Sequence, residues 1–443
     1  MPVIEVLNPS VTIHQPLGKI KHDESTNSGN IAILENIFVQ QYGLPSNDFS
    51  NRLTLIYGDQ KTVARLRSVK ARRKEENDPF NSFKWVLPIP ALFHLKMNLI
   101  ALIHKTFFQE DNHRGEAWSL AYSRDSLNRK KIGSKSSNFF DQEEFIIHNF
   151  QARVLAVMNA QSEESPRSDG TFSLAQSTPE ELNLAIEHTA SRLFDDSLSE
   201  EIGNEYWNHV QFLRITLSYL LLKYSIKHGD IGLLRQAITF ACFYFNGSKQ
   251  RNYAYETLYL FHLTCTQAAD PSLQRAILAN GLINWQGKDN TWWETDRGVE
   301  VHNGNMKAII RGRRTSNLDL DYLFDYCALN SAFYSRLQGT LYRRFGVDKN
   351  DDHQHTPKSA EADIRRLAMQ LKSSILLGKN CTYRAADLFA EGADKLYKNI
   401  EAFNARSMVD VDDQVEIEDS EFYEFYDCDA STERTLMDKS LDY

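Results

Sequence analysis

The chain has 443 residues with 42% hydrophobic content, enough apolar material to bury a sizeable core. Its five cysteines are scattered without a CxxC pair, which excludes a sequence motif for structural zinc and favours a reduced, intracellular compartment. The longest apolar stretch, residues 210–226, is interrupted by polar and charged side chains and therefore predicts a buried core helix instead of a membrane span. The opening MPVIEVLNPS lacks a basic segment followed by an apolar one, so no secretory signal is expected.

Charge is distributed unevenly along the chain. Residues 408–443 contain thirteen acidic side chains against Arg434 and Lys439, a net charge of −11, while the whole chain carries −9. The part before this tail is therefore close to neutral, at about +2. We expect the acidic tail to be disordered. Its interleaved Phe and Tyr residues also fit a segment that binds a protein partner or shields a basic patch on the same chain.

The first chemically distinctive region begins with a short strand. Leu53 to Tyr57 form a β-branched and aromatic run that Gly58 stops, so Asp59 is predicted at the strand end. Side chains at the carboxyl ends of strands often bind ligands or act in catalysis. A Gly-Asp pair is also common in turns for local reasons, because Asp accepts hydrogen bonds from the following backbone. Both interpretations stay open from these residues alone.

A strongly basic segment follows, and its composition favours a helix. Seven cations are the predicted nucleic-acid-binding residues: Lys61, Arg65, Arg67, Lys70, Arg72, Arg73 and Lys74. Such a helix could hold a phosphate backbone beside an acidic site. Residues 70–74 could equally be a nuclear-targeting patch, and a solvated helix face is the commonest role of such a run.

A second strand is predicted over residues 83–90, followed by a helix. Pro88 and Pro90 cannot donate to a ladder, which excludes a fully central strand. From Leu92 an apolar residue recurs every three or four positions as far as Phe107, which predicts a helix with His94 in its first turn. The imidazole could contact a phosphate or a metal, although histidines at such positions are usually packing residues.

The rest of the chain predicts helices almost throughout. One helix is expected over residues 142–158, a linker over 159–173, and a nearly continuous helical body from Thr178 to residue 403. The expected fold class is therefore α+β and predominantly helical, with a small N-terminal sheet around residues 50–90. We predict three parts: an α/β segment over residues 1–160, a helical body over 178–403 and an acidic tail over 408–443.

Two late motifs in the helical body contain further polar candidates. Glu256 lies in RNYAYETLYLFH among tyrosines, where an unpaired carboxylate would be costly, so a buried partner such as Arg251 or a tyrosine hydroxyl is favoured. In ETDRGVEVHNGNMK, a helix would align Glu300, Asn303 and Lys307 on one side.

The second motif has two more polar groups. His302 lies close to this polar side but is angled away from it, and Asp296 adds a carboxylate before it. Several kinds of polar residue therefore converge here, which favours a site over an ordinary surface helix.

Four of these stretches carry a resemblance to a known family: GDQKTVARLRS, WVLPIPALFHLKMN, RNYAYETLYL and ETDRGVEVHNGNMK. Together they resemble a large fungal domain family of unknown function that is associated with transposable elements, over most of residues 15–345. The order of strand, Asp, basic segment, strand, His-bearing helix and late Glu resembles a diverged RNase H-like transposase core.

That resemblance implies an Mg²⁺ site with Asp59 and Glu300 as metal ligands and His94 as a third catalytic residue. It also implies an earlier acidic strand that this sequence does not show, so the site is expected to be incomplete or inactive.

The leading prediction is a transposon-derived protein that binds DNA or RNA and whose Mg²⁺-dependent phosphodiester-cleaving site has degenerated. The location would be intracellular, with the nucleus as one option, and no membrane partner is expected. The alternative is a non-enzymatic helical scaffold for protein interactions. If the first prediction holds, Asp59, His94 and Glu300 should lie around one pocket although they are distant in sequence.

Overall fold

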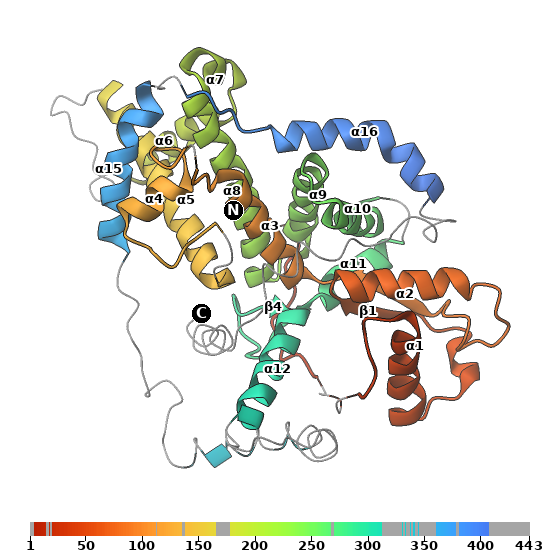
Figure 1. Ribbon diagram of the computed structural model, residues 1–443. Coiled ribbons are helices and arrows are strands. Elements are labelled where there is room, and N and C mark those ends of the chain that lie inside the picture. The colour runs from red at the N-terminus through yellow and green to blue at the C-terminus, as the bar shows by residue number, and fades with distance from the viewer. Residues whose placement is uncertain are drawn as a thin grey trace.

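The computed structural model describes residues 4–14, 17, 20–111, 113–134, 138–164, 178–266, 270–311, 360–377 and 381–406, and six isolated positions between 330 and 344. Helices dominate these residues, and one two-stranded parallel sheet lies near the N-terminus (Figure 1). The predicted helical fold class with a small N-terminal sheet is therefore confirmed. The acidic tail over residues 408–443 lies outside the described residues.

The N-terminal lobe is a βαβ unit with helical turns packed beside it. Its elements are α1 (Asn27–Glu35), a π-helical turn (Asn36–Gln41), a 3₁₀ turn (Ser46–Phe49), β1 (Thr54–Gly58), α2 (Gln60–Arg72) and β2 (Val86–Pro90). Parallel strands need a crossover, and α2 supplies it. An aromatic cluster that includes Phe49, Phe80 and Trp85 fills this lobe, with the Phe49 and Trp85 rings 4.6 Å apart.

The register of the sheet explains how two prolines fit into β2. Ile56 lies opposite Pro88, and Gly58 lies opposite Pro90. Because neither proline has an N–H to donate, the prolines suit a strand at the edge of a sheet. The N–H of Ala91, just after β2, donates to the Gly58 carbonyl oxygen at 2.9 Å. The two strand ends are thereby held side by side where α2 and the next helix begin.

The body is built from helices around one large apolar core. Its elements are α3 (Leu92–Phe107), α4 (Leu120–Ser126), α5 (Phe139–Glu164), α6 (Pro179–Leu193), α7 (Asp196–Ile202), α8 (Asn204–His228), α9 (Ile231–Gly247), α10 (Arg251–Cys265), α11 (Pro271–Asn280), β3 (Leu282–Ile283), β4 (Trp293–Glu294), α12 (Thr295–Arg311), α15 (Glu361–Leu377) and α16 (Leu388–Arg406). The helix predicted over 142–158 lies within α5, and the predicted start at Thr178 is the capping box of α6.

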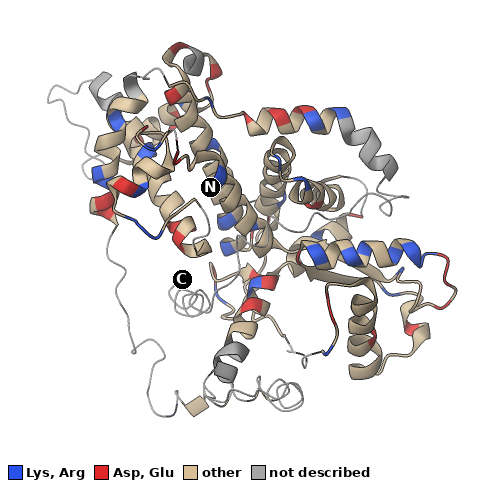
Figure 2. Ribbon diagram, in the orientation of Figure 1, with Lys and Arg blue, Asp and Glu red and all other residues tan. Residues whose placement is uncertain are grey.

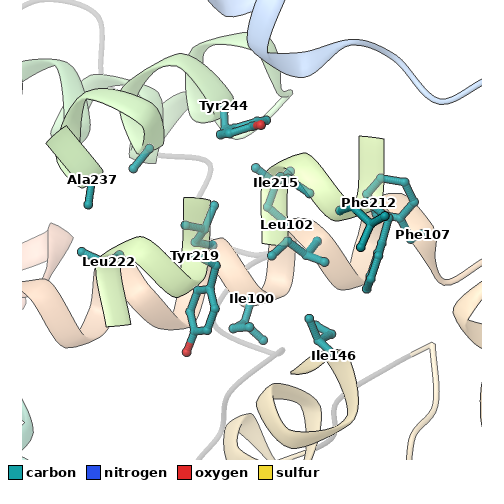
Figure 3. Close-up of a cluster of buried hydrophobic side chains, with 14 of the residues drawn as sticks. Ile100, Leu102, Phe107, Ile146, Phe212, Ile215, Tyr219, Leu222, Ala237 and Tyr244 are labelled. Carbon is teal, nitrogen blue, oxygen red and sulfur yellow. The ribbon is translucent and has the colours of Figure 1, made fainter. Parts of the chain in front are cut away.

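The centre of this core is the contact between α3 and α8, with α5 and α9 packed against it (Figure 3). Ile100 of α3, Phe212 of α8 and Ile146 of α5 are fully buried, and the Phe107 and Phe212 rings meet edge to face at 5.3 Å. Each such side chain contributes about 1.5–3 kcal/mol through burial. The core thus fixes α3, and with it the position of His94, on the body.

Within the described residues, no helix combines the length and the apolar character that a membrane crossing requires.

Candidate functional site

The segments that carried the family resemblance converge at the carboxyl ends of β1 and β2. A small pocket there has a volume of about 280 Å³, counting its solvent-open part. Its lining residues come from β1, α2, β2, α3 and α10: Gly58, Gln60, Pro90, Ala91, His94, Leu95, Tyr253, Glu256, Thr257 and Leu260. The first turn of α12 lies against the start of α3 beside this pocket. Segments about 200 residues apart in sequence therefore lie side by side at this pocket.

Asp59 follows β1 directly and is the N-cap of α2. Its Oδ1 accepts a hydrogen bond from the Thr62 N–H at 2.8 Å, so the carboxylate satisfies one of the free N–H groups of the helix end. Asp59 thus has the strand-end position that was predicted, and it also has the local role that was the alternative. One of its oxygens is committed to the helix.

His94 lies in the first turn of α3 and is paired with Asp296 from the first turn of α12. The Asp296 carboxylate accepts hydrogen bonds from the N–H of Phe93 at 3.0 Å and of His94 at 3.1 Å. The His94 Nδ1 lies 3.0 Å from Asp296 Oδ2. The N-cap residue Ala91 has no side-chain oxygen, so Asp296 caps α3 from a distant part of the chain.

The pKa of His94 depends on three carboxylates, and Asp296 has the largest effect among them. Burial acts to lower the pKa of His94, but the hydrogen bond and charge of Asp296 outweigh it, and the charges of Asp59 and Glu300 act in the same direction. The net pKa is raised. Asp59 and Glu300 are therefore each near enough to act on His94, while Asp296 is the direct partner of the imidazole. Of the three residues predicted around one pocket, only His94 is among the lining residues given above. A histidine whose Nδ1 donates to a carboxylate exchanges protons through Nε2, the arrangement of an oriented acid–base group.

The donor set around His94 does not fit the expected Mg²⁺ site. Among the described side chains, no group of three or more His, Cys, Asp or Glu is placed to hold a metal ion. Asp59 caps α2, and both oxygens of Asp296 accept hydrogen bonds from α3. Asp59 and Glu300 alone would supply fewer ligands than a two-metal centre needs. We therefore derive no chemical step through a metal.

Glu256 forms a buried ion pair with Arg67, 189 residues earlier, instead of with the predicted Arg251 or a tyrosine hydroxyl. Both guanidinium NH groups of Arg67 donate to the two carboxylate oxygens, and the NH1 contact is 2.8 Å. The guanidinium also lies over the rings of Tyr255 and Tyr259, 4.9 and 4.8 Å from their centroids. The side chains are only 9% and 2% exposed. This pair joins α2 to α10 at the pocket, which Glu256 lines.

The predicted nucleic-acid-binding segment therefore divides into two groups. Arg67 faces Glu256, the Lys70 Nζ donates to the Val86 carbonyl oxygen at 2.7 Å, and an Arg73 NH group donates to Asn81 Oδ1 at 3.0 Å. Burial also lowers the pKa of Lys70. Lys70 and Arg73 are paired within the lobe, and Arg67 joins the lobe to α10 of the body. The second group comprises Lys61, Arg65, Arg72 and Lys74. Lys61 and Arg65 are half-buried, whereas Arg72 and Lys74 are exposed.

A second buried pair joins two of the resemblance motifs and was not singled out from the sequence. Lys96 of α3 donates to Glu294 of β4, and the side chains are 5% and 1% exposed. Its sequence signal was available, because a lysine between Leu95 and Met97 interrupts an apolar helix and needs a partner. Burial acts to raise the pKa of Glu143 in the core, but the charges of Lys96 and Lys223 and the hydrogen bonds to Glu143 outweigh it, so its pKa is lowered.

The remaining residues of the late motif lie on α12. The His302 ring lies 5.6 Å from His14 and 5.8 Å from Trp285. Burial, and then the charge of His14, lower its pKa. Asn303 is half-buried on the same helix, and the side chain of Lys307 lies outside the described residues.

Comparison with known proteins gives one match. The model of a family described as "Family of unknown function (DUF6589)" matches residues 1–354. The search of curated proteins found no match. No solved structure matched either. The matched range contains both strands, α10, α12 and the whole pocket, whereas α15 and α16 follow it.

Proposed function

The chain belongs to this family of unknown function (DUF6589), and from that premise we propose that it binds nucleic acid through the outer face of α2. One observation carries the proposal: the helix that packs against the pocket also presents a row of cations. Lys61, Arg65 and Arg72 are separated by four and seven residues, which places them on one helical face. Figure 2 shows basic residues along much of α2.

The chemistry of this surface suits a phosphate backbone. Lys and Arg side chains that approach phosphates release condensed counterions, and that release supplies most sequence-independent affinity. Because Arg67, Lys70 and Arg73 are paired inward, the segment offers at most about four cations to a phosphate backbone, so we expect weak binding with a shallow salt dependence.

We further propose that the lobe descends from an RNase H-like transposase core that has lost its cleavage activity. Two features support this: the βαβ unit places Asp59 at a strand end, and the charges of Asp59 and Glu300 both act on His94. Among the side chains that the structure describes, Asp59 and Glu300 offer fewer carboxylates than a two-metal centre needs, which supports the loss of activity. The expected behaviour is binding without efficient strand cleavage.

The test is a salt titration of binding to labelled single-stranded and double-stranded DNA and RNA. Arg72→Glu/Lys74→Glu should weaken binding about tenfold or more at low salt and reduce the salt slope by about 1–2. The matched control is Lys130→Glu/Lys131→Glu, which reverses two exposed charges beyond α4. Equal loss in both variants, or no binding by the full chain at low salt, would overturn the proposal.

Removing the acidic tail gives a second test of the same proposal. Residues 408–443 carry a net charge of −11, so the tail should compete with nucleic acid for the basic face. A chain ending at residue 407 is therefore expected to bind more tightly than the full chain. An unchanged affinity would show that the tail does not contact this face.

A cleavage assay with Mg²⁺ completes the test. We expect at most slow cleavage that Asp59→Ala leaves unchanged. Efficient cleavage that Asp59→Ala abolishes would show that the site is complete. The second candidate, a scaffold for protein interactions, is favoured by the way α8 and α9 hold the segment after residue 380, and absence of nucleic-acid binding would favour it further.

A further inference from the structure

A C-terminal segment is bound across the helical body in a way that resembles a peptide bound to a receptor. This segment, hereafter the arm, comprises residues 381–406: an extended stretch followed by α16. It lies beyond the range of the family match, whereas the helices that hold it, α8 and α9, lie within that range. Figure 1 shows α16 running across α9 at the edge of the body.

The extended stretch is held through its backbone by side chains of α8. The Asn208 amide donates to the Tyr383 carbonyl oxygen at 3.0 Å and accepts from the Ala385 N–H at 2.7 Å. The Trp207 indole N–H donates to the Ala385 carbonyl oxygen at 2.7 Å. One asparagine and one tryptophan therefore satisfy the polar groups of an extended backbone, as a sheet edge does for a bound peptide.

The same side of α8 makes a fourth backbone contact. Asn204 donates to the Cys381 carbonyl oxygen at 2.9 Å. Trp207 and Asn208 follow Asn204 by three and four residues, so one face of α8 makes all of these contacts. Asn208 is fully buried, which makes its paired hydrogen bonds costly to lose.

Two aromatic side chains anchor the arm, one in the extended stretch and one in the first turn of α16. The Tyr383 ring stacks on Trp118 with centroids 4.7 Å apart and planes 3° from parallel. The Phe389 ring packs among rings of α9 and lies 4.8 Å from Phe243 and 5.6 Å from Tyr244. Large aromatic anchors of this kind supply most of the affinity in peptide and protein interfaces.

A glycine pair allows α16 to approach α9 closely. A Cβ on Gly392 would overlap the Phe243 carbonyl oxygen, and a Cβ on Gly247 would overlap the Leu388 carbonyl oxygen. The contact therefore requires glycine on both helices. A helix that binds here must therefore have glycine four positions after its first residue, as Gly392 follows Leu388 in α16.

We propose that this groove on α8 and α9, closed at one end by Trp118, is a peptide-docking site. The arm occupies it in cis, and the arm of a second copy of the chain occupies it when the cis arm is displaced. Every contact described above is available to a second copy, because none depends on the covalent link between body and arm. Linkage to the body gives the cis arm an effective concentration of about millimolar, so the cis form dominates in dilute solution.

The experiment uses the full chain with a substitution that detaches the cis arm. Gly392→Leu should expel α16 because of the overlap with Phe243, and the exposed Asp394→Leu is the matched control on the same helix. A fluorescent peptide of residues 381–406 is then titrated into each chain. Limited proteolysis near Lys395 and Lys398 reports whether the cis arm is released.

The expected result is saturable binding of the peptide to the Gly392→Leu chain, with at least tenfold weaker binding to the unmodified chain and to Asp394→Leu. A peptide that itself carries Gly392→Leu should not bind. If Gly392→Leu loses its helical circular dichroism, Phe389→Ala serves as the second releasing variant. An arm that stays protected in both variants, or a released arm without saturable peptide binding, would overturn the proposal.

Discussion

Two charged pairs beside the same pocket differ in how far they are removed from water. Arg67 and Glu256 are 9% and 2% exposed and flanked by tyrosine rings, whereas His94 and Asp296 are 28% and 11% exposed. The buried pair has exchanged hydration for two hydrogen bonds between fixed side chains. The open pair keeps an imidazole that can still exchange protons with solvent. The difference indicates that the first pair stabilises the fold and that the second stays accessible to solvent.

Breaking the buried pair should have the largest effect. Glu256→Ala leaves the Arg67 guanidinium buried without its counter-charge, which costs about 3–5 kcal/mol of the free energy of unfolding. Urea denaturation measures this loss. The control is Arg67→Met/Glu256→Met, which removes both charges and should recover most of it. If the double variant were no more stable than Glu256→Ala, packing and not charge would explain the loss.

Removing the cap of α3 should have an intermediate effect. Asp296→Ala leaves the N–H groups of Phe93 and His94 without their acceptor, at a cost of about 1–2 kcal/mol, and also lowers the pKa of His94. Denaturation and an NMR titration of the His94 ring measure the two effects. Asp270→Ala, at the exposed N-cap of α11, should give a similar stability loss without changing that pKa. An unchanged His94 pKa in Asp296→Ala would contradict the pairing.

The pair of His94 and Asp296 should also make a smaller, pH-dependent contribution to the free energy of unfolding. The folded pKa of His94 is raised, so its contribution to stability is fully present below the unfolded pKa of about 6.5 and is lost as pH rises through the folded pKa. The unfolding free energy of the natural chain minus that of His94→Gln should therefore decrease with rising pH above about 6.

His104 provides the opposite case as a control for that measurement. It is 2% exposed, and burial lowers its pKa to about 4. Its unfolded state binds a proton first as pH falls, so its contribution is lost below about pH 6.5. The difference between the natural chain and His104→Gln should therefore have the opposite slope. Equal slopes would contradict the assigned environments.

The smallest effect on stability is expected on the outer face of α2. Arg72→Glu/Lys74→Glu changes exposed side chains that do not share the buried pair of Arg67, so the free energy of unfolding should change by less than about 0.5 kcal/mol per substitution. Thermal denaturation checks this. A larger loss would mean that these cations stabilise the lobe, and reduced nucleic-acid binding by the variant could not then be assigned to lost contacts.

Part of the site could be predicted from the sequence because its determinants are local. The apolar run that ends at Gly58 predicted β1, and the recurrence of apolar residues from Leu92 predicted α3 with His94 in its first turn. Periodicity and capping depend on residues within one or two turns, so the sequence contains them directly. The same reasoning placed Asp59 at a strand end.

The partners of the charged residues could not be predicted in this way. The sequence showed that Glu256 needs a partner but favoured nearby Arg251 or a tyrosine hydroxyl. It also left the basic run around Arg67 open between a nucleic-acid-binding helix, a nuclear-targeting patch and a solvated face. Helical periodicity says which residues share a face but not which distant element covers that face. The packing of α10 against α2 turned Arg67 inward and left other cations outside.

The amino-acid sequence by itself determined the helical character of this protein, the short strands near its N-terminus and the chemical types present at their ends. Only the tertiary structure decided that Asp296 caps α3 and orients His94, because that contact joins residues 202 positions apart. Local preferences are set by backbone sterics and periodic burial. Long-range pairing is instead set by how the core of α3, α5, α8 and α9 packs, and no local pattern in the chain specifies that packing.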